Sequence, residues 1–176
     1  MEKMRRRRDV LIRLEEPRDY SAVYAVNSAA FETAAEANLV EALRKEADAV
    51  ISMVAEEKGK IVGHIMFSPV TISGCAYLKL TGLAPMAVKH EHQGKGIGSG
   101  LVRAGLEKCK EYEFGAVFVL GHTWFYPRFG FLPSARYGIQ CEYDVPEDVF
   151  MVLELKPDYL QGVCGTIKYH PAFKDV

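Results

Sequence analysis

The chain has 176 residues, 49% hydrophobic and 26% charged, which is typical of one globular domain and not of a disordered or fibrous chain. Its 22 lysines and arginines nearly balance 23 aspartates and glutamates, and a net charge of −1 excludes the long-range basic field of a general nucleic-acid binder. No apolar run approaches the ~20 residues of a membrane span, and the basic opening residues lead into no apolar segment of a secretory signal.

We expect residues 10–176 to form a single domain and residues 1–9 to form a basic tail that contains Arg5–Arg8. A flexible extension is the favoured interpretation of this tail, and an RNA-binding arm is the alternative. The cysteines form no Cys-x-x-Cys pair, which indicates neither a zinc knuckle nor a disulfide frame and favours a cytoplasmic location. His90 and His92 lie in a charged loop where histidines are usually solvated, so no metal is expected.

Residues 10–50 predict a strand followed by two helices. Val10–Leu14 alternates apolar and charged side chains, as a short strand does, and Asp19 is placed to cap the helix that follows. The first helix is expected to end near Phe31, and the second is amphipathic. Their apolar faces carry Val23, Val26 and Ala30 in the first helix and Leu39, Val40 and Leu43 in the second.

The next segments predict antiparallel strands. Ile51–Glu56 and Ile61–Ile72 are rich in β-branched residues and flank a Glu-Lys-Gly-Lys turn, which is typical of a hairpin. The apolar run Leu78–Val88 follows, but Gly82 and Pro85 interrupt it. Glycine and proline inside a strand indicate a bulge or an unpaired edge, because the backbone there cannot complete its ladder.

Glycines at positions 94, 96, 98 and 100 lead into an apolar helical stripe, and Ala116–Leu120 then predicts a short buried strand. Strand, glycine loop, helix and strand between residues 80 and 120 form a parallel βαβ unit. Further strands are expected at Ile139–Tyr143 and Phe150–Leu155. One parallel unit set among hairpins predicts an α+β domain with a mixed sheet.

A glycine-rich turn from a strand into a helix directs backbone N–H groups toward one place, which suits a phosphate or pyrophosphate. A Walker loop needs Ser or Thr after Gly-Lys, whereas Lys95 is followed by Gly96. The dinucleotide fingerprint, if it began at Gly96, would need glycine where Leu101 stands. Both of these phosphate motifs are therefore excluded.

Three segments carry a resemblance to the GCN5-related N-acetyltransferase (GNAT) family. Gln93–Gly98 matches the pattern Q/R-x-x-G-x-G/A of the family's acetyl-coenzyme A (acetyl-CoA) loop, and Leu83–Val88 resembles the strand before it. Tyr126–Phe131 is similar to the Tyr-x-x-x-Gly-Phe segment after the fifth strand. The opening helices, residues 63–69 and Phe150–Leu155 further resemble a bacterial subgroup of predicted acetyltransferases, so the resemblance extends over nearly the whole chain.

The resemblance implies the GNAT fold: a central, strongly twisted, mixed but mostly antiparallel sheet flanked by helices, with a parallel pair that splays around coenzyme A. It implies an acyltransferase that moves an acetyl group from its co-substrate acetyl-CoA to a primary amine, by direct attack in a ternary complex. No cysteine lies in the loop or near Tyr126, so a covalent acyl-cysteine route is not expected.

The same resemblance implies which residues bind the coenzyme. Backbone groups of one strand segment would contact the thioester and pantetheine arm, and N–H groups of the loop would wrap the pyrophosphate. Lys95 would add a cation near the phosphates, with a solvated lysine as the alternative. The residues concerned are Met86, Ala87 and Val88 on the strand, Gln93, Gly94, Lys95, Gly96, Ile97, Gly98 and Ser99 in the loop, and Tyr126.

Tyr126 is the expected general acid, because a phenol within hydrogen-bond reach can protonate the coenzyme A thiolate as it leaves. An unperturbed phenol and thiol differ by only ~1.5 pKa units, so this proton transfer needs little tuning. Membership of the aromatic core is the alternative role for Tyr126. One departure from the family is that Gly121 and His122 follow the fifth strand where many relatives carry Asn, which leaves a pantetheine contact there open.

The general base has several candidates, because an alkyl ammonium group must lose a proton before or during attack. His64 is the catalytic candidate retained beside Tyr126, on account of its suitable unperturbed pKa, and a buried structural histidine is the alternative. Glu32, Glu36, His122 and ordered water are the others.

The partners expected are acetyl-CoA and an amine acceptor that is a small molecule or a peptide or protein amine. Neither a membrane nor a nucleic acid is expected, and a homodimer is one compatible assembly. The second function considered is a non-catalytic acyl-CoA sensor or interaction module, which would keep the loop and not use the acid. The acceptor itself cannot be read from the sequence.

Overall fold

The computed structural model describes residues 9–176, and the tail Arg5–Arg8 lies outside the described residues. One sheet spans most of this range, with strand order β1-β2-β3-β4-β5-β8-β6, and β9 pairs with both β3 and β7. The described strands are β1 (Val10–Leu14), β2 (Ile51–Glu57), β3 (Lys60–Ile72), β4 (Leu80–Val88), β5 (Ala116–Leu120), β6 (Leu132–Pro133), β7 (Ile139–Cys141), β8 (Phe150–Glu154) and β9 (Gly165–Lys168).

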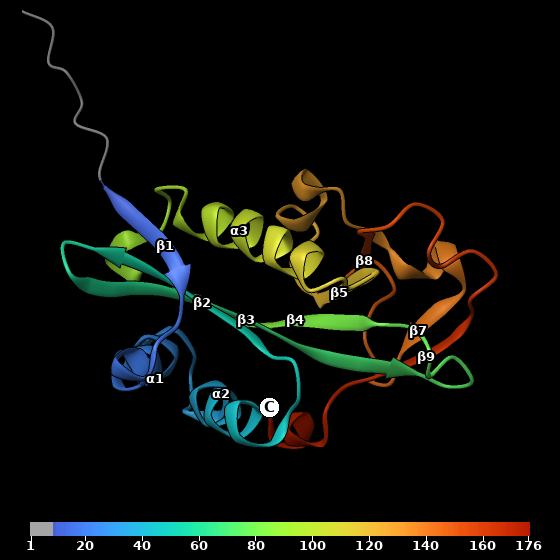
Figure 1. The fold of residues 1–176 in the computed structure, drawn as a ribbon, viewed down its shortest axis with the longest axis horizontal. Helices are drawn as coiled ribbons and strands as arrows, with labels where there is room; N and C mark the ends of the chain where they lie inside the picture. The colour runs from blue at the N-terminus through green and yellow to red at the C-terminus, as the bar shows by residue number, and fades with distance from the viewer. Residues whose placement is uncertain (1–8) are drawn as a thin grey trace, which may run out of the picture.

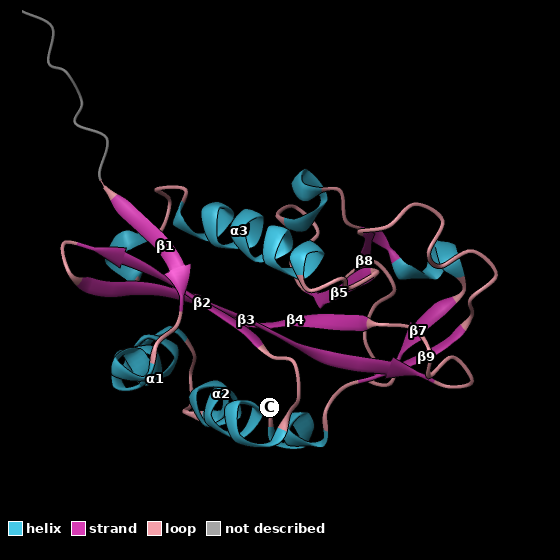
Figure 2. Cartoon of the chain, in the orientation of Figure 1, coloured by secondary structure: helices cyan, strands magenta, loops and turns pink. Residues whose placement is uncertain are grey.

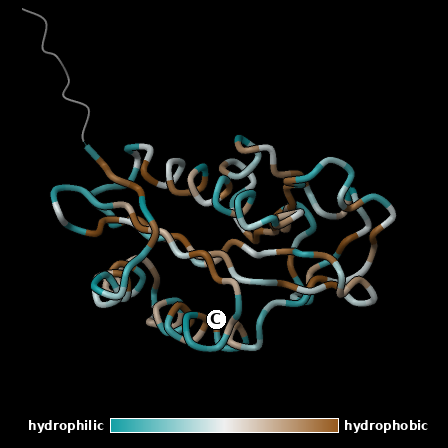
Figure 3. The backbone as a smooth tube through the Cα atoms, viewed as in Figure 1, coloured by the Kyte–Doolittle hydropathy of each residue, from teal (hydrophilic) through white to brown (hydrophobic). Residues whose placement is uncertain are grey.

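Three α-helices cover the two faces of this sheet: α1 (Tyr20–Ala30), α2 (Ala35–Glu46) and α3 (Ile97–Glu111). Helices α1 and α2 lie on one face and α3 lies on the other, as Figures 1 and 2 show. The strands therefore bury side chains in both directions, and the hydrophobic residues follow the central strands (Figure 3). Leu43 of α2 and Leu101 of α3 are fully buried in the two separate cores.

The predicted α+β fold with a mixed sheet is confirmed. Strands β4 and β5 pair in parallel, whereas β1-β2, β2-β3, β3-β4, β5-β8 and β6-β8 pair antiparallel. The short strands β6 and β9 were not expected from the sequence. Each has few residues and depends on pairing with a distant strand, so its own residues carry little signal.

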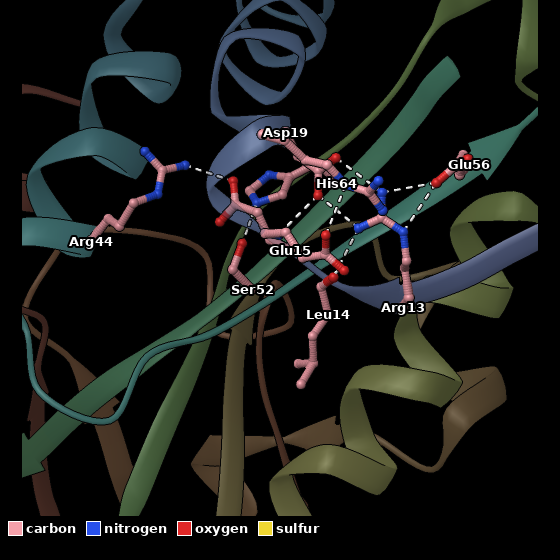
Figure 4. Close-up of polar contacts among 10 residues, drawn as sticks. Arg13, Leu14, Glu15, Asp19, Arg44, Ser52, Glu56 and His64 are labelled. Atoms are coloured by element: carbon pink, nitrogen blue, oxygen red, sulfur yellow. Dashed lines mark hydrogen bonds and ion pairs between the residues drawn. The ribbon is translucent and has the colours of Figure 1, made fainter. Parts of the chain in front are cut away.

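Asp19 does not cap helix α1 in the way expected. Its side chain makes no cap hydrogen bond to that helix. The carboxylate instead accepts bonds from Arg13 at 2.6 and 2.9 Å, and Arg13 also reaches Glu56, joining β1, β2 and the turn before α1 (Figure 4). The hydrogen bond from Arg13 holds the pKa of the Asp19 carboxyl below its usual value.

Strand β4 carries the interruption that Gly82 and Pro85 indicated. Its pairing with β5 runs from Leu80 to Gly82 and ends there. On the other edge, Ile65 pairs with Met86 and Phe67 pairs with Leu83, so two β4 residues face the single residue between them on β3. The parallel pair β4 and β5 therefore separates from Leu83 onward.

No helix within residues 9–176 is long and apolar enough to cross a membrane.

Candidate active site

The separation of β4 from β5 opens a cavity of about 560 Å³ at the start of helix α3. Its walls come from the end of β4, from the glycine loop and from the turn after β5. They include Met86, Val88, Gln93, Gly94, Gly96, Ile97, Gly98, Ser99, His122, Trp124, Phe125, Tyr126 and Arg128. The loop and the Tyr-x-x-x-Gly-Phe segment, separated in the sequence, thus face the same space.

The glycines of the loop are required by backbone conformation. Gly94 has φ 68° and Gly96 has φ 83°, in the left-handed region that side chains rarely adopt. A Cβ atom added at either residue would meet nothing within 4 Å. Conformation, and not crowding by protein atoms, therefore explains glycine at these two positions.

The start of helix α3 presents unpaired donors to the cavity. Gly96 occupies the N-cap position without a side-chain cap, and the first turn contains no acidic residue. The N–H groups of Ile97, Gly98 and Ser99 are in the first turn, where no intrahelical acceptor exists, and the helix dipole adds positive charge there. Gln93 holds the loop in place, because its Nε2 atom donates to the Val88 carbonyl oxygen at 3.0 Å.

The cation that lines the cavity is Arg128 and not Lys95, which was expected near the phosphates. Lys95 donates to the carbonyl oxygen of Glu91 and lines a neighbouring hollow beside Val10 and Ile12, not the cavity that Gly98 lines. Arg128 does line the cavity, with its guanidinium 4.8 Å from the Phe125 ring centroid. Sequence reasoning missed Arg128, although its position inside the Tyr-x-x-x-Gly-Phe segment was a usable signal.

The three strand residues expected at the thioester point alternately to the two faces of β4. Met86 and Val88 line the cavity, whereas the Ala87 side chain is 4% exposed and belongs to the core on the α1 face. A contact from Ala87 to a ligand would therefore come from its backbone, as the resemblance implies.

A second cavity of about 600 Å³ adjoins the first. It lies between β4, the end of β5, the α1–α2 connection and the C-terminal segment, and its lining is mostly apolar and aromatic. Met86, His122 and Tyr126 line both cavities. These three residues therefore form the boundary between a space beside the helix N-terminus and a space on the α1–α2 side.

Tyr126 lies at this boundary with 6% of its surface exposed. Its ring meets Phe125 edge-on at 5.0 Å and Phe131 at 5.7 Å between centroids, so the aromatic-core role and the site role coexist. A Cβ atom on Gly121 would lie 2.1 Å from Cε2 of the Tyr126 ring. Gly121 is consequently the residue that lets this ring reach the boundary, a role that sequence reasoning missed.

Burial raises the pKa of the Tyr126 hydroxyl to about 12. The phenol therefore keeps its proton at every pH near neutrality. The pKa of Tyr126 is also further above that of a thiol than the pKa of an unperturbed phenol is, since desolvation penalises the phenolate.

His64 lies on β3 in the interior and lines neither cavity. Its side chain is fully buried, with Nδ1 3.0 Å from Asn27 Nδ2. Nε2 lies 2.9 Å from Ser52 Oγ (Figure 4). Asn27 Nδ2 also donates to the Val23 carbonyl oxygen, which assigns Nδ1 as the acceptor and Nε2 as the protonated nitrogen. Desolvation, and then the nearby Arg44 charge, lower the pKa of His64 to about 3.

This position does not support the catalytic role expected for His64. A base must reach the proton that it removes, and both ring nitrogens are already paired inside the core. Of the other candidates, Glu36 and His122 line the second cavity, whereas the exposed Glu32 does not. Within the described part of the chain, no group of three His, Cys, Asp or Glu side chains is arranged to hold a metal ion.

The chain is similar to bacterial acetyltransferases in sequence. A family model described as an acetyltransferase (GNAT) domain matches residues 11–133. Over 165 residues, the chain is 37% identical to the uncharacterized N-acetyltransferase YhbS of Escherichia coli K12, covering 93% of this chain and 98% of that protein. The family resemblance carried by the three motifs is thereby confirmed.

The similarity extends to solved structures. YhbS of Escherichia coli in complex with CoA matches with a TM-score of 0.88 at 36% identity, covering 93% of this chain and 91% of that chain. A GNAT family acetyltransferase from Brucella melitensis in complex with acetyl-CoA matches with a TM-score of 0.78 at 34% identity, covering 95% and 99% respectively.

Proposed function

The chain belongs to the GNAT acetyltransferase family, and from that premise we propose that it transfers an acetyl group from acetyl-CoA to a primary amine in a ternary complex. One observation carries this proposal: Tyr126, Met86 and His122 line two adjoining cavities. A direct transfer needs two substrates that meet at a shared wall. The relatives solved with CoA and with acetyl-CoA support binding of the coenzyme by this chain, and we place it on the glycine loop.

The residues of the first cavity fit a pyrophosphate. Left-handed Gly94 and Gly96 lead directly into α3, whose first residues line the cavity, and the helix dipole favours an anion there. Arg128 adds a side-chain cation to the same wall, and we assign it the phosphate role first expected for Lys95. Met86 and Val88 line the continuation of this cavity along β4, which suits the pantetheine arm.

Acetyl-CoA supplies the acetyl group as a thioester, so a carbon–nitrogen bond to the acceptor forms as the carbon–sulfur bond breaks. Tyr126 donates its proton to the departing sulfur in this proposal, and the second proton that the acceptor nitrogen loses as the amide forms returns the phenolate to a phenol. With its pKa raised to about 12, the phenol lies ~3.5 units above an ordinary thiol. That pKa gap corresponds to about 5 kcal/mol of cost for transferring the proton to a finished thiolate. The proton therefore moves only as negative charge develops on sulfur and the carbon–nitrogen bond forms.

The proton of the acceptor ammonium leaves through the second cavity. Glu36 and His122 line that cavity and are in position to accept it directly or through water. We assign His64 no role in the chemistry, because the buried ring is not among the described residues that line either cavity. We propose a structural role for it between α1 and the sheet.

The test is acetyl-CoA turnover against a pooled library of primary amines, with the modified amine identified by its mass. The expected result is release of free CoA that depends on amine and yields one or a few acetylated products. Tight coenzyme binding without turnover on any amine would instead indicate a non-catalytic acyl-CoA sensor.

A further inference from the structure

We propose that the acceptor is a primary amine with a single positive charge carried on an apolar or aromatic body, and that Glu36 binds its ammonium group. This inference rests on the proposed function, because it names the class of molecule that occupies the second cavity. It is carried by the walls of that cavity, by the Glu36 carboxylate and by the acidic side chains of an adjoining hollow.

The walls form an aromatic surface assembled from distant parts of the chain. Tyr169 and Phe173, from the C-terminal segment, have ring centroids 5.0 Å apart, and Tyr143 lies 5.8 Å from Tyr169. Phe31 contributes from the end of α1, and Leu39 from α2. A cavity of about 600 Å³ with such walls suits a drug-sized or smaller apolar body, which gains by leaving water.

Glu36 places a carboxylate in this apolar lining. Its Oε2 atom is shielded from solvent and has no hydrogen-bond partner among the described residues. A buried carboxylate oxygen is normally paired, because desolvation without a donor is costly. The Glu36 side chain as a whole is half-buried and lines the cavity. An ammonium group that contacts this carboxylate from the cavity would supply the opposite charge, and rotation of the carboxylate would give Oε2 the donor that it lacks.

The charges of the site select one kind of amine. None of the described residues that line the cavity is a lysine or an arginine, so the carboxylate of an amino acid would meet no permanent cation there. Tyr143 and Val145 also line a separate hollow that adjoins this cavity. The walls of that hollow carry the exposed side chains of Glu142, Asp144 and Glu147. These carboxylates, beside the cavity, attract cations and repel anions.

A polycation is disfavoured by the same walls. Glu36 is the only aspartate or glutamate side chain among the described lining residues, so a second or third ammonium group inside the cavity would find no further acidic side chain to pair with. A single ammonium group attached to an apolar body would pair with Glu36 and would place its apolar part against the aromatic walls.

The first test compares acetyl-CoA turnover with 2-phenylethylamine, phenylalanine and spermidine. These share a primary amine and differ by an added carboxylate or by added charges. We expect kcat/KM for 2-phenylethylamine to exceed that for each of the others by about 10- to 100-fold, the range for one unpaired charge. Equal or better turnover of phenylalanine or spermidine would overturn the inference and leave the proposed function standing.

Glu36→Gln is the matching variant, and Glu46→Gln on the exposed end of the same helix is its control. Glu36→Gln should lower kcat/KM for 2-phenylethylamine by about 10- to 100-fold without changing CoA affinity, whereas Glu46→Gln should leave both unchanged. Inhibition by the uncharged 2-phenylethanol should be the same in Glu36→Gln and in the parent. If Glu36→Gln left kcat/KM unchanged, the assignment of Glu36 would be wrong.

A binding measurement separates this inference from the proposed function. Saturable binding of 2-phenylethylamine to the CoA-loaded protein, weakened in Glu36→Gln, would support the acceptor class even if no amine were acetylated, in which case only the proposed function fails. Absence of such binding, with CoA bound and another amine turned over, would overturn the acceptor class alone. Absence of binding together with absence of turnover would overturn both.

Discussion

Acidification should destabilise the folded protein through His64, because this ring is held neutral in the core. Burial lowers its pKa to about 3 from the ordinary 6.5, so between these values the unfolded chain binds a proton that the folded chain does not. Stability therefore falls as pH falls through this window. Relative to pH 7, the loss from this single group is about 0.7 kcal/mol at pH 6 and about 2 kcal/mol at pH 5.

The measurement is urea unfolding of the parent and of His64→Gln at pH 7, 6 and 5. The other titrating groups are shared, so the difference between the two pH dependences isolates His64. The parent should lose about 2 kcal/mol more than the variant between pH 7 and pH 5, although the variant begins less stable because it disturbs the bonds to Asn27 and Ser52.

Parallel loss of stability in the parent and the variant would refute the reasoning, since it would mean that the folded ring accepts a proton freely.

The same variant also tests catalysis. If His64→Gln stayed folded but lost turnover by 100-fold or more, the ring would be the general base after all. Turnover within about twofold of the parent agrees with a structural role.

Three further changes test the site. Tyr126→Phe should lower the single-turnover rate by about 10²- to 10⁴-fold with little change in CoA affinity, because it removes the proton and keeps the ring; a rate equal to that of the parent would return Tyr126 to the aromatic core. Gly96→Glu should weaken CoA binding by about 100-fold or more through its charge, measured by the fluorescence of Trp124, the single tryptophan, which lines the cavity. Gly59→Glu is its control, since Gly59 also has a left-handed φ of 76° with open space around it, and equal CoA affinity in both variants would count against the loop. Gly121→Ala should lower turnover and spare CoA binding, because its Cβ atom would displace the Tyr126 ring; unchanged turnover would show that the position of the ring is unimportant.

The glycine loop, where we propose that the coenzyme binds, follows from the sequence because its requirements are local. Positive φ values at Gly94 and Gly96, a helix that starts directly after them and the absence of acidic residues in its first turn all involve neighbouring residues. Short-range patterns likewise predicted β1 to β5 and the three helices. The interruption of β4 was predicted as well, since Gly82 and Pro85 act on their own backbone.

The acceptor side depended on tertiary structure. Its cavity joins Phe31, Glu36, Tyr143 and Tyr169, which come from four separate segments, and only their packing leaves an oxygen of Glu36 buried and unpaired. Burial also decided the state of His64, because the free energy of charging an imidazole depends on every group around it and not on its neighbours in sequence. Local backbone conformation is set by adjacent residues, whereas solvation and proximity are properties of the whole packed chain.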